Sequence, residues 1–190
     1  MREIIIDKNI ALSLPNSSDI KTWVKWMKDK KISHNTLRVP FPYREKDGKD
    51  FLKICAAAKK KFGMQMNWAI RNSEGELIGV IGFHGKYGKG SHKDEIGYWL
   101  AKPYRRKGIM KKVINRMCKH GFEKMKLKRI EASIFPFNIA SMKLLQQCGF
   151  KFEGRLRKSY FKKGKYIDGM MYAKVQKVYV QLVNINLLSS

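Results

Sequence analysis

Apolar and polar residues follow two different periods along this chain, and together they predict strands that alternate with helices. Apolar runs bounded by turn residues predict strands at residues 4–14, 68–71, 77–84, 94–101, 128–135, 150–161 and 166–175. Residues 72–75, which read Asn-Ser-Glu-Gly, predict a hairpin turn between two of these strands. Residues 163–165 predict the turn between the last two strands.

Helical spacing of apolar residues predicts helices at residues 19–27, 46–61, 107–125 and 138–147. Asp19 is predicted as the N-cap of the first helix, since a carboxylate there accepts hydrogen bonds from unpaired N–H groups. Pro40 and Pro42 exclude regular structure from residues 39–43. Strands that alternate with helices predict an α/β fold, an α+β sandwich with a mixed sheet.

Composition sets limits on the class of protein. The chain has 190 residues, 44% of them hydrophobic, and no repeat, low-complexity tract or linker, which predicts one domain over residues 1–190. No apolar stretch is long enough to span a bilayer, and the N-terminus turns to charge too early for a signal peptide. We therefore expect a cytoplasmic protein without a membrane segment.

The net charge of +26 predicts attraction to polyanions such as phosphorylated cofactors, RNA or ribosomes. The alternative is a lysine-rich proteome that decorates every solvated face, because the basic residues are dispersed rather than gathered in one block. Cys55, Cys118 and Cys148 show no metal or disulfide spacing, and the four histidines form no metal pattern with them. We expect free thiols and no metal.

The run from Tyr104 to Met110 carries the clearest chemical signal. It follows a predicted strand, contains Gly108 within a basic turn, and opens an amphipathic helix. Such a turn directs backbone N–H groups and a positive helix end at a phosphate, and glycine lets the ligand approach the backbone closely. The alternative for its basic side chains is an ordinary solvated turn.

With its context, this motif resembles the GCN5-related N-acetyltransferases, and within them the ribosomal-protein acetyltransferase-like branch. The family marker is Gln or Arg, two variable residues, Gly, one variable residue, then Gly or Ala, and residues 105–110 match except at Met110. Methionine at that place is familiar in the ribosomal-protein-like branch. Segments 95–100, 138–141 with 149–150, and 153–156 followed by 166–168 also resemble that branch. The resemblance covers about residues 6–175 and implies that these form the core of the domain.

The resemblance implies a mostly antiparallel sheet with flanking helices and a V-shaped splay between the strands at 95–100 and 129–135. It also implies that acetyl-coenzyme A (acetyl-CoA) lies in the splay, with its pantetheine arm along the first strand and its pyrophosphate on the basic turn. The residues so implied for cofactor binding are Tyr98, Trp99, Leu100, Arg105, Arg106, Lys107, Gly108, Ile109, Met110, Asn138, Ser141 and Lys143. A helix cap for Asn138, and a solvated surface position for Ser141 and Lys143, are the alternatives.

Three residues are candidates for catalysis within the resemblance. Ser141 would donate a proton or hydrogen bond to the departing thiolate. Glu95 is the candidate base, and its alternative is an exposed strand carboxylate. Tyr160 stands where some relatives have a carboxylate, so it could act as an acid or line the acceptor pocket, against the alternative of a packed strand tyrosine.

The acceptor is expected to be a primary amine. A lysine amine with a pKa of ~10.4 must lose a proton at a cost, whereas an α-amine at ~7.7–8.0 is already partly neutral. Residues 34–40 lie where the family places the acceptor wall. A protein N-terminus, by analogy one presented on the ribosome, is the first choice. The alternatives are a small amine (polyamine, amino acid or antibiotic) and a non-enzymatic RNA- or ribosome-binding protein. The resemblance also implies that the chain could form a homodimer, because homodimers are common in this family.

Overall fold

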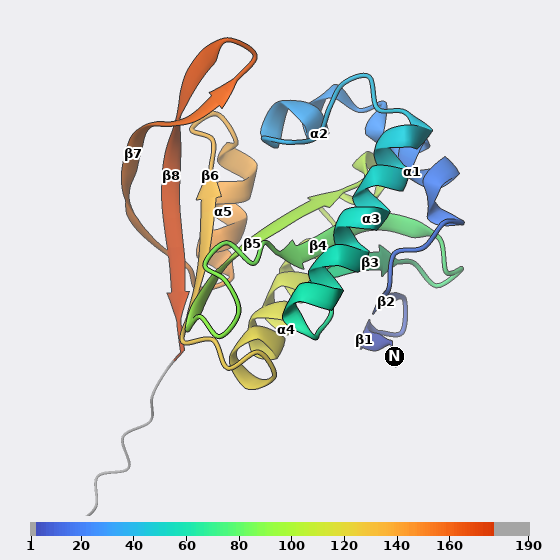
Figure 1. Cartoon of the computed structure of the whole chain (residues 1–190), viewed down its shortest axis with the longest axis horizontal. Coiled ribbons are helices and arrows are strands. Elements are labelled where there is room, and N and C mark those ends of the chain that lie inside the picture. The colour runs from blue at the N-terminus through green and yellow to red at the C-terminus, as the bar shows by residue number, and fades with distance from the viewer. Residues whose placement is uncertain (1–2, 177–190) are drawn as a thin grey trace, which may run out of the picture.

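The computed structural model describes residues 3–176, which form one eight-stranded sheet with helices against both faces (Figure 1). The strands are β1 (Ile4–Asp7), β2 (Ile10–Ser13), β3 (Asn67–Arg71), β4 (Leu77–Phe83), β5 (Lys93–Leu100), β6 (Arg129–Ile134), β7 (Lys151–Lys162) and β8 (Lys165–Val175). The helices are α1 (Asp19–Met27), α2 (Lys30–Asn35), α3 (Glu45–Phe62), α4 (Ile109–Glu123) and α5 (Ile139–Gln147), with a 3₁₀ turn at Lys102–Tyr104.

The strand order is β1-β2-β3-β4-β5-β6-β8-β7, and the neighbouring strands are antiparallel except for β5 and β6. These two run parallel and pair over three positions only, the last of which joins Glu95 to Glu131. Beyond Glu95 the two strands diverge, as Figure 1 shows, while β5 stays paired with β4 as far as Leu100. The sheet is therefore split from one end.

Each face of the sheet has its own apolar core. The α4 side chains Val113, Ile114 and Met117 pack with strand residues such as Ile81 and Ile130 on one face, all with no exposed area. On the other face, α1 contributes Trp23 and Met27, which pack with Leu77 and Val80 of β4. Because buried side chains on both faces exclude water, β4 is apolar along its whole length.

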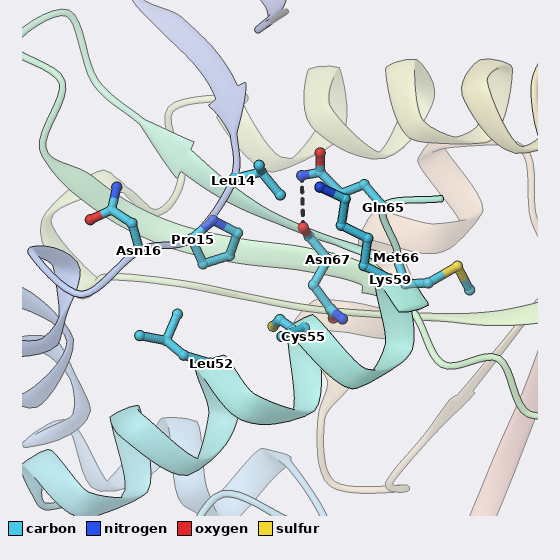
Figure 2. Close-up of a pocket in the computed structure, with 10 residues that line it drawn as sticks. Leu14, Pro15, Asn16, Leu52, Cys55, Lys59, Gln65, Met66 and Asn67 are labelled. Atoms are coloured by element: carbon cyan, nitrogen blue, oxygen red, sulfur yellow. Dashed lines mark hydrogen bonds between the residues drawn. The ribbon is translucent and has the colours of Figure 1, made fainter. Parts of the chain in front are cut away.

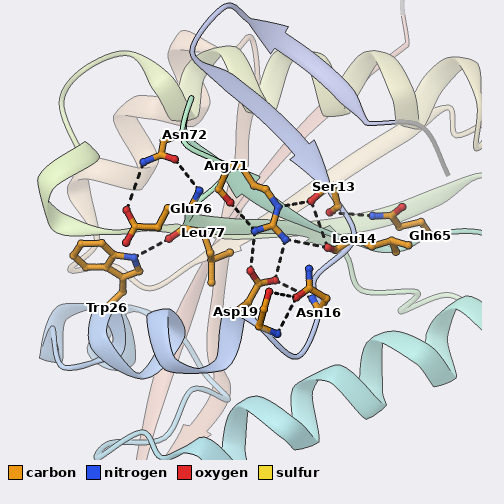
Figure 3. Close-up of polar contacts among 12 residues, drawn as sticks. Ser13, Leu14, Asn16, Asp19, Trp26, Gln65, Arg71, Asn72, Glu76 and Leu77 are labelled. Atoms are coloured by element: carbon orange, nitrogen blue, oxygen red, sulfur yellow. Dashed lines mark hydrogen bonds and ion pairs between the residues drawn. The ribbon is translucent and has the colours of Figure 1, made fainter.

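A buried ion pair joins the start of α1 to the middle of the sheet (Figure 3). Arg71, at the end of β3, donates to both carboxylate oxygens of Asp19 at 2.8 and 3.0 Å, and these side chains are only 11% and 3% exposed. The same guanidinium also donates to Ser13 Oγ and to the carbonyl oxygen of Leu14. One side chain thus connects β2, β3 and α1.

The predicted fold class is confirmed, and three details differ. The single strand predicted at residues 4–14 is divided into β1 and β2, because residues 8 and 9 form a turn in which the Asn9 N–H donates to Asp7. Asp19 is the first residue of α1 rather than its N-cap, because its carboxylate is taken by Arg71. Helix α2 was not predicted. The single-domain prediction extends to residues 1–2 and 177–190, which lie outside the described residues.

We predict that Asp19→Ala lowers the free energy of unfolding by about 3–5 kcal/mol, because it leaves the Arg71 guanidinium buried without its partner. Urea unfolding monitored by circular dichroism measures this. The control is Asp50→Ala, which removes an exposed ion pair to Lys53 and should cost less than about 1 kcal/mol. Equal losses in the two variants would contradict a structural role for the buried pair.

Candidate active site

Beside the splay between β5 and β6 lies a cavity of about 1120 Å³, slightly above the usual range for ligand sites. Three parts of the chain line it: α2, the end of β5 with the turn that follows, and the start of α5. Most residues expected to hold a cofactor are among those that line it: Tyr98, Trp99, Leu100, Arg105, Arg106, Gly108, Ile109, Met110, Asn138 and Ser141. Lys107 and Lys143 are exposed and lie outside the lining.

The turn before α4 gathers backbone N–H groups at one end of the cavity. Arg106 (φ 62°) and Gly108 (φ 74°) both have left-handed backbone, a combination that forms an anion-binding concavity of N–H groups. Gly108 is the N-cap of the 15-residue helix α4, whose first N–H groups have no partner within the helix. A Cβ built on Gly108 would meet nothing within 4 Å, so the space in front of the turn is open. The geometry suits a phosphate.

The basic side chains of this turn have different roles. Arg105 Nε donates to the carbonyl oxygen of Leu100 at 2.8 Å, and its Nη1 lies 2.8 Å from Oδ2 of Asp29, which comes just before α2. That second contact is an ion pair without an aligned hydrogen bond. Arg105 therefore ties the turn to β5 and α2, whereas the exposed side chain of Arg106 projects from the cavity wall.

Met110, which departs from the family marker, is buried in the core beneath this turn, with 7% of its surface exposed. It belongs to the same buried cluster as the α4 residues Val113 and Ile114, and it also lines the cavity. The larger residue at this position fills the core and leaves the turn accessible.

One edge of β5 faces the cavity with backbone groups free. On the β4 side, the carbonyl of Glu95 accepts from the N–H of His84, just after β4, at 2.9 Å, and the N–H of Ala101 donates to Ile78 of β4 at 2.8 Å. Because backbone groups alternate along a strand, those of Tyr98 and Leu100 point the other way, toward the splay. No strand pairs with that edge after Glu95 in residues 3–176, and Arg105 takes the Leu100 carbonyl. An amide-bearing ligand could pair there as an added strand.

A pair of hydroxyl groups lies at the wall of the cavity. Tyr98 Oη and Ser141 Oγ are 2.6 Å apart, and burial raises the pKa of Tyr98 well above its usual value. Ser141 is 8% exposed, so it is not a surface serine. Asn138 caps α5 by accepting from the Ser141 N–H at 3.4 Å. Its amide nitrogen is not used in that bond and remains available as a donor.

Glu95 is a buried carboxylate, 8% exposed, which removes the alternative of an exposed strand residue. Lys86 Nζ lies 2.8 Å from its Oε2, and His84 Nδ1 lies 3.7 Å from its Oε1. Burial would raise the pKa of Glu95, but hydrogen bonds and charge from His84 and Lys86 outweigh it, so the pKa is lowered. A Cβ on Gly97 would lie 2.4 Å from His84 Nε2, so only glycine leaves room for this imidazole.

Aromatic side chains continue the wall on the side of α2. His34 lies 4.4 Å from Phe137 between ring centroids, and Phe135 lies 5.4 Å from Phe137 and 5.3 Å from Tyr160. Burial raises the pKa of Tyr160, and the nearby Glu95 charge adds to this. Of residues 34–40, which are expected to form a wall, His34, Asn35 and Thr36 line the cavity and residues 37–40 do not. Tyr160 packs against this wall and is not part of the lining.

Lys162, near the end of β7, holds this wall in place. Its Nζ donates to the carbonyl oxygens of Ser33, of His34 at 3.2 Å and of Thr36 at 2.5 Å, at the C-terminal end of α2. A cation is favourable there because the last carbonyls of a helix have no partner within it. Lys162 therefore joins the β7–β8 hairpin to α2.

Sequence reasoning missed Asp29, His84 and the role of Lys162. The signal for α2 was present, since Asp29 precedes it and accepts from the Lys31 N–H at 3.0 Å as an N-cap. His84 and Lys162 could not be found in this way, because their partners are 11 or more residues away in the chain.

A second, smaller cavity of about 270 Å³ lies between α3 and strands β2 and β3 (Figure 2). Leu14, Leu52 and Met66 make it mostly apolar, and Gln65 bonds across its edge to the carbonyl of Asn67. Burial raises the pKa of the Cys55 thiol at its wall to about 12, so this thiol is not a nucleophile at neutral pH. The lining of this smaller cavity contains no counterpart of the glycine turn, the free strand edge or the hydroxyl pair of the larger cavity.

Within residues 3–176, no helix is both long and apolar enough to cross a bilayer. No group of three histidine, cysteine, aspartate or glutamate side chains there is placed to hold a metal ion. Cys148 is buried in the core, as expected.

Comparisons with known proteins point in one direction. A family model described as an acetyltransferase (GNAT) domain matches residues 9–151. The chain is 38% identical over 124 residues to an uncharacterized N-acetyltransferase, YoaA, of Bacillus subtilis (strain 168), covering 65% of this chain and 68% of that protein. It is 33% identical over 88 residues to the spermine/spermidine N(1)-acetyltransferase of the same organism, covering 44% and 58%. The chain thus spans between 58% and 68% of these relatives.

Among solved structures, RimL, a ribosomal L7/L12 alpha-N-protein acetyltransferase in complex with coenzyme A, superposes with a TM-score of 0.78. The match covers 92% of this chain and 98% of that one at 18% sequence identity. At this identity the likeness shows a shared fold.

Because the pKa values of Glu95 and Glu131 are lowered in the folded protein, we predict that the free energy of unfolding decreases at acidic pH. Burial raises the pKa of Glu131, but the Tyr87 hydroxyl, Arg129 and Lys93 lower it by more. A folded-state pKa below the unfolded value of ~4.3 contributes stability that is present above that pH and lost as the pH falls through the folded value. Urea unfolding from pH 7 to 3 should show a smaller loss for Glu131→Gln than for the unmodified chain. If the free energies of unfolding of the two proteins fell by the same amount over this pH range, the prediction for Glu131 would be wrong.

Proposed function

Because the chain belongs to the GNAT family of acetyltransferases, we propose that it transfers the acetyl group of acetyl-CoA to a primary amine held in the cavity between β5 and β6. The observation that carries this proposal is the joint placement, around one cavity, of an anion-binding turn, a free strand edge and a buried hydroxyl pair. Acetyl-CoA presents these three chemistries in order, as phosphate, amide arm and thioester sulfur.

The cavity wall suits the cofactor along its length. The N–H groups from Arg106 to Met110 would receive the pyrophosphate, with added attraction from the Arg106 and Lys107 charges. The free backbone groups of Tyr98 would pair with the amide arm, and the Asn138 amide would donate to it. When bound, acetyl-CoA supplies an acetyl group activated as a thioester.

The hydroxyl pair is the proposed acid. Ser141 and Tyr98 share a hydrogen bond of 2.6 Å, so a proton given up by one can be replaced from the other. The raised pKa of Tyr98 keeps its hydroxyl protonated at neutral pH. A backbone N–H of the Tyr98–Leu100 segment on the free edge of β5 would donate to the carbonyl oxygen as negative charge develops there.

Glu95 and Tyr160 are proposed for the amine side of the reaction. The lowered pKa of Glu95 keeps it ionised at neutral pH, which allows it to accept a proton but makes it a weak base. Neither side chain lines the cavity, so proton transfer would pass through a water molecule. A weak, relayed base suits an α-amine, which is already partly neutral. Tyr160 would bound the amine site through its packing on Phe135.

The proposed acceptor is a protein or peptide N-terminus. The aromatic wall of His34 and Phe137 offers apolar contact to a peptide end, and the name of the structural neighbour RimL supports this class. The spermine/spermidine relative supports a polyamine instead. Asp29 is the one carboxylate in the lining of the described cavity, and it is paired with Arg105, so a polycation would find little negative charge there.

The cofactor site is tested by calorimetric titration of nucleic-acid-free protein with acetyl-CoA. We expect one-to-one binding that Gly108→Glu weakens at least tenfold, since it places a negative charge where the phosphates would lie and strains a left-handed position. The matched control is Gly108→Asn, because asparagine tolerates left-handed backbone without adding charge. Folded protein that binds no acetyl-CoA would overturn the proposal and favour a non-enzymatic RNA-binding role.

The acid is tested by Tyr98→Phe and Ser141→Ala. Each should lower kcat by about 10²–10⁴ with little change in the Kd of acetyl-CoA, because the hydroxyls act on the leaving sulfur. The double variant should lose little more than the worse single variant, since the two groups act as a unit. Additive losses would show that the two hydroxyls act independently.

The acceptor class is tested by comparing short peptides that have a free α-amine with their N-blocked lysine-containing counterparts and with spermine. We expect kcat/KM to be highest for the free α-amine. Lys162→Met should raise the acceptor KM without changing the Kd of acetyl-CoA, because it releases α2 from the hairpin. Turnover of spermine alone would move the assignment to polyamines.

A further inference from the structure

The outer part of the β7–β8 hairpin carries two exposed aromatic side chains that pack against each other. Phe161 and Tyr166 are opposite one another in the strand register, and their ring centroids are 5.1 Å apart. They are 62% and 67% exposed, the two most exposed rings among the large hydrophobic residues of the described chain. Burial in the domain does not account for these rings.

The same hairpin is strongly basic once its internal ion pairs are accounted for. Its two carboxylates are neutralised, Glu153 by Arg129 and Asp168 by Arg155. Five further basic side chains on it are exposed and make no ion pair within residues 3–176: Lys151, Arg157, Lys158, Lys163 and Lys165. Positive charge therefore extends along β7 and around its turn, on both sides of the aromatic pair.

The hairpin end is held in place from the other side. Lys162 alternates with Phe161 along β7, and its bonds to the α2 carbonyls fix the strand end against the body of the domain. Charge reversal at residue 162 would therefore also disturb the wall formed by the end of α2, so Lys162 is unsuitable for testing this surface. Lys163 and Lys165 are exposed and make no such bonds to α2, so substituting them changes the charge of this surface without disturbing the acceptor wall.

We propose that the outer face of the β7–β8 hairpin binds single-stranded RNA, with bases stacked on Phe161 and Tyr166 and phosphates along the flanking lysines and arginines. Exposed aromatic rings beside a basic track are the combination that binds single strands, since every base has a face to stack and every nucleotide a charge. This proposal does not depend on the acetyl-transfer reaction.

Charge and geometry favour single-stranded RNA over a second copy of the chain, a nucleic-acid duplex or a lipid surface as the ligand of this face. A second copy of the chain would bring two positive faces together, which is unfavourable. A duplex keeps its bases stacked within itself and so has no use for the rings. An anionic lipid surface could take up apolar side chains and lysines, but it would not require aromatic rings in particular.

Fluorescence anisotropy of a short labelled oligouridylate, titrated with the full chain at several salt concentrations, tests the proposal. The variant Phe161→Leu with Tyr166→Leu keeps apolar bulk but removes the stacking faces, and we expect it to weaken binding about tenfold or more. Lys163→Ala with Lys165→Ala should reduce the slope of log K against log salt by about 1.4. The charge-matched control, Lys46→Ala with Lys60→Ala on α3, should bind within about twofold of the unmodified chain.

Four outcomes would overturn the proposal. The first is that the chain shows no saturable binding of oligouridylate at physiological salt, and the second is that the leucine variant binds oligouridylate as tightly as the unmodified chain. The third is that a duplex of the same length binds as tightly as the single strand. The fourth is that the α3 lysine variant loses as much affinity as the hairpin lysine variant. Anionic vesicles that bind through Phe161 and Tyr166 while RNA does not would assign the face to a membrane. Each variant is also titrated with acetyl-CoA, and unchanged affinity shows that the fold and the cofactor site are intact. If the unmodified chain binds no acetyl-CoA, the acetyl-transfer proposal fails, and the RNA-binding proposal is still decided by the oligouridylate titrations.

Discussion

Strands β5 and β6 pair over three positions, and the candidate active site depends on the shortness of this parallel ladder. Up to Glu95 the two strands share hydrogen bonds, and beyond it each keeps only its outer neighbour, β4 or β8. The unpaired edge of β5 would be costly if it were buried dry, because backbone groups without partners lose their hydration. Opening the sheet into a cavity leaves that edge accessible to water or to a ligand with amide groups.

The walls of this cavity are connected by a few long basic side chains. Arg105 links the phosphate-type turn to β5 and to Asp29 before α2, and Lys162 links the other end of α2 to the β7–β8 hairpin. Helix α2 has only six residues, too short to be stable by itself, so its position depends on these ties. Part of the large positive charge is therefore structural, and only the remainder, such as Lys163 and Lys165, is free for a polyanion.

Much of the fold could be predicted because local signals agreed with the final arrangement. The stripe from Met110 to Met117 predicted α4, and the run at residues 72–75 predicted the β3–β4 turn. Predictions failed where a distant partner decided the outcome. Asp19 has the chemistry of an N-cap, but Arg71, 52 residues away, takes its carboxylate. Arg105 belongs to a phosphate-type motif, yet its guanidinium is used by Leu100 and Asp29.

The sequence by itself determined the strands, four of the five α-helices of the described chain, and the glycine turn at Gly108, because each depends on periodicity or on the backbone freedom of single residues. Only the tertiary structure decided that Tyr98 meets Ser141, that Glu95 is buried with Lys86 and His84, and that β5 separates from β6. These contacts join segments far apart in the chain, and their free energies come from burial and charge pairing, which no local pattern encodes.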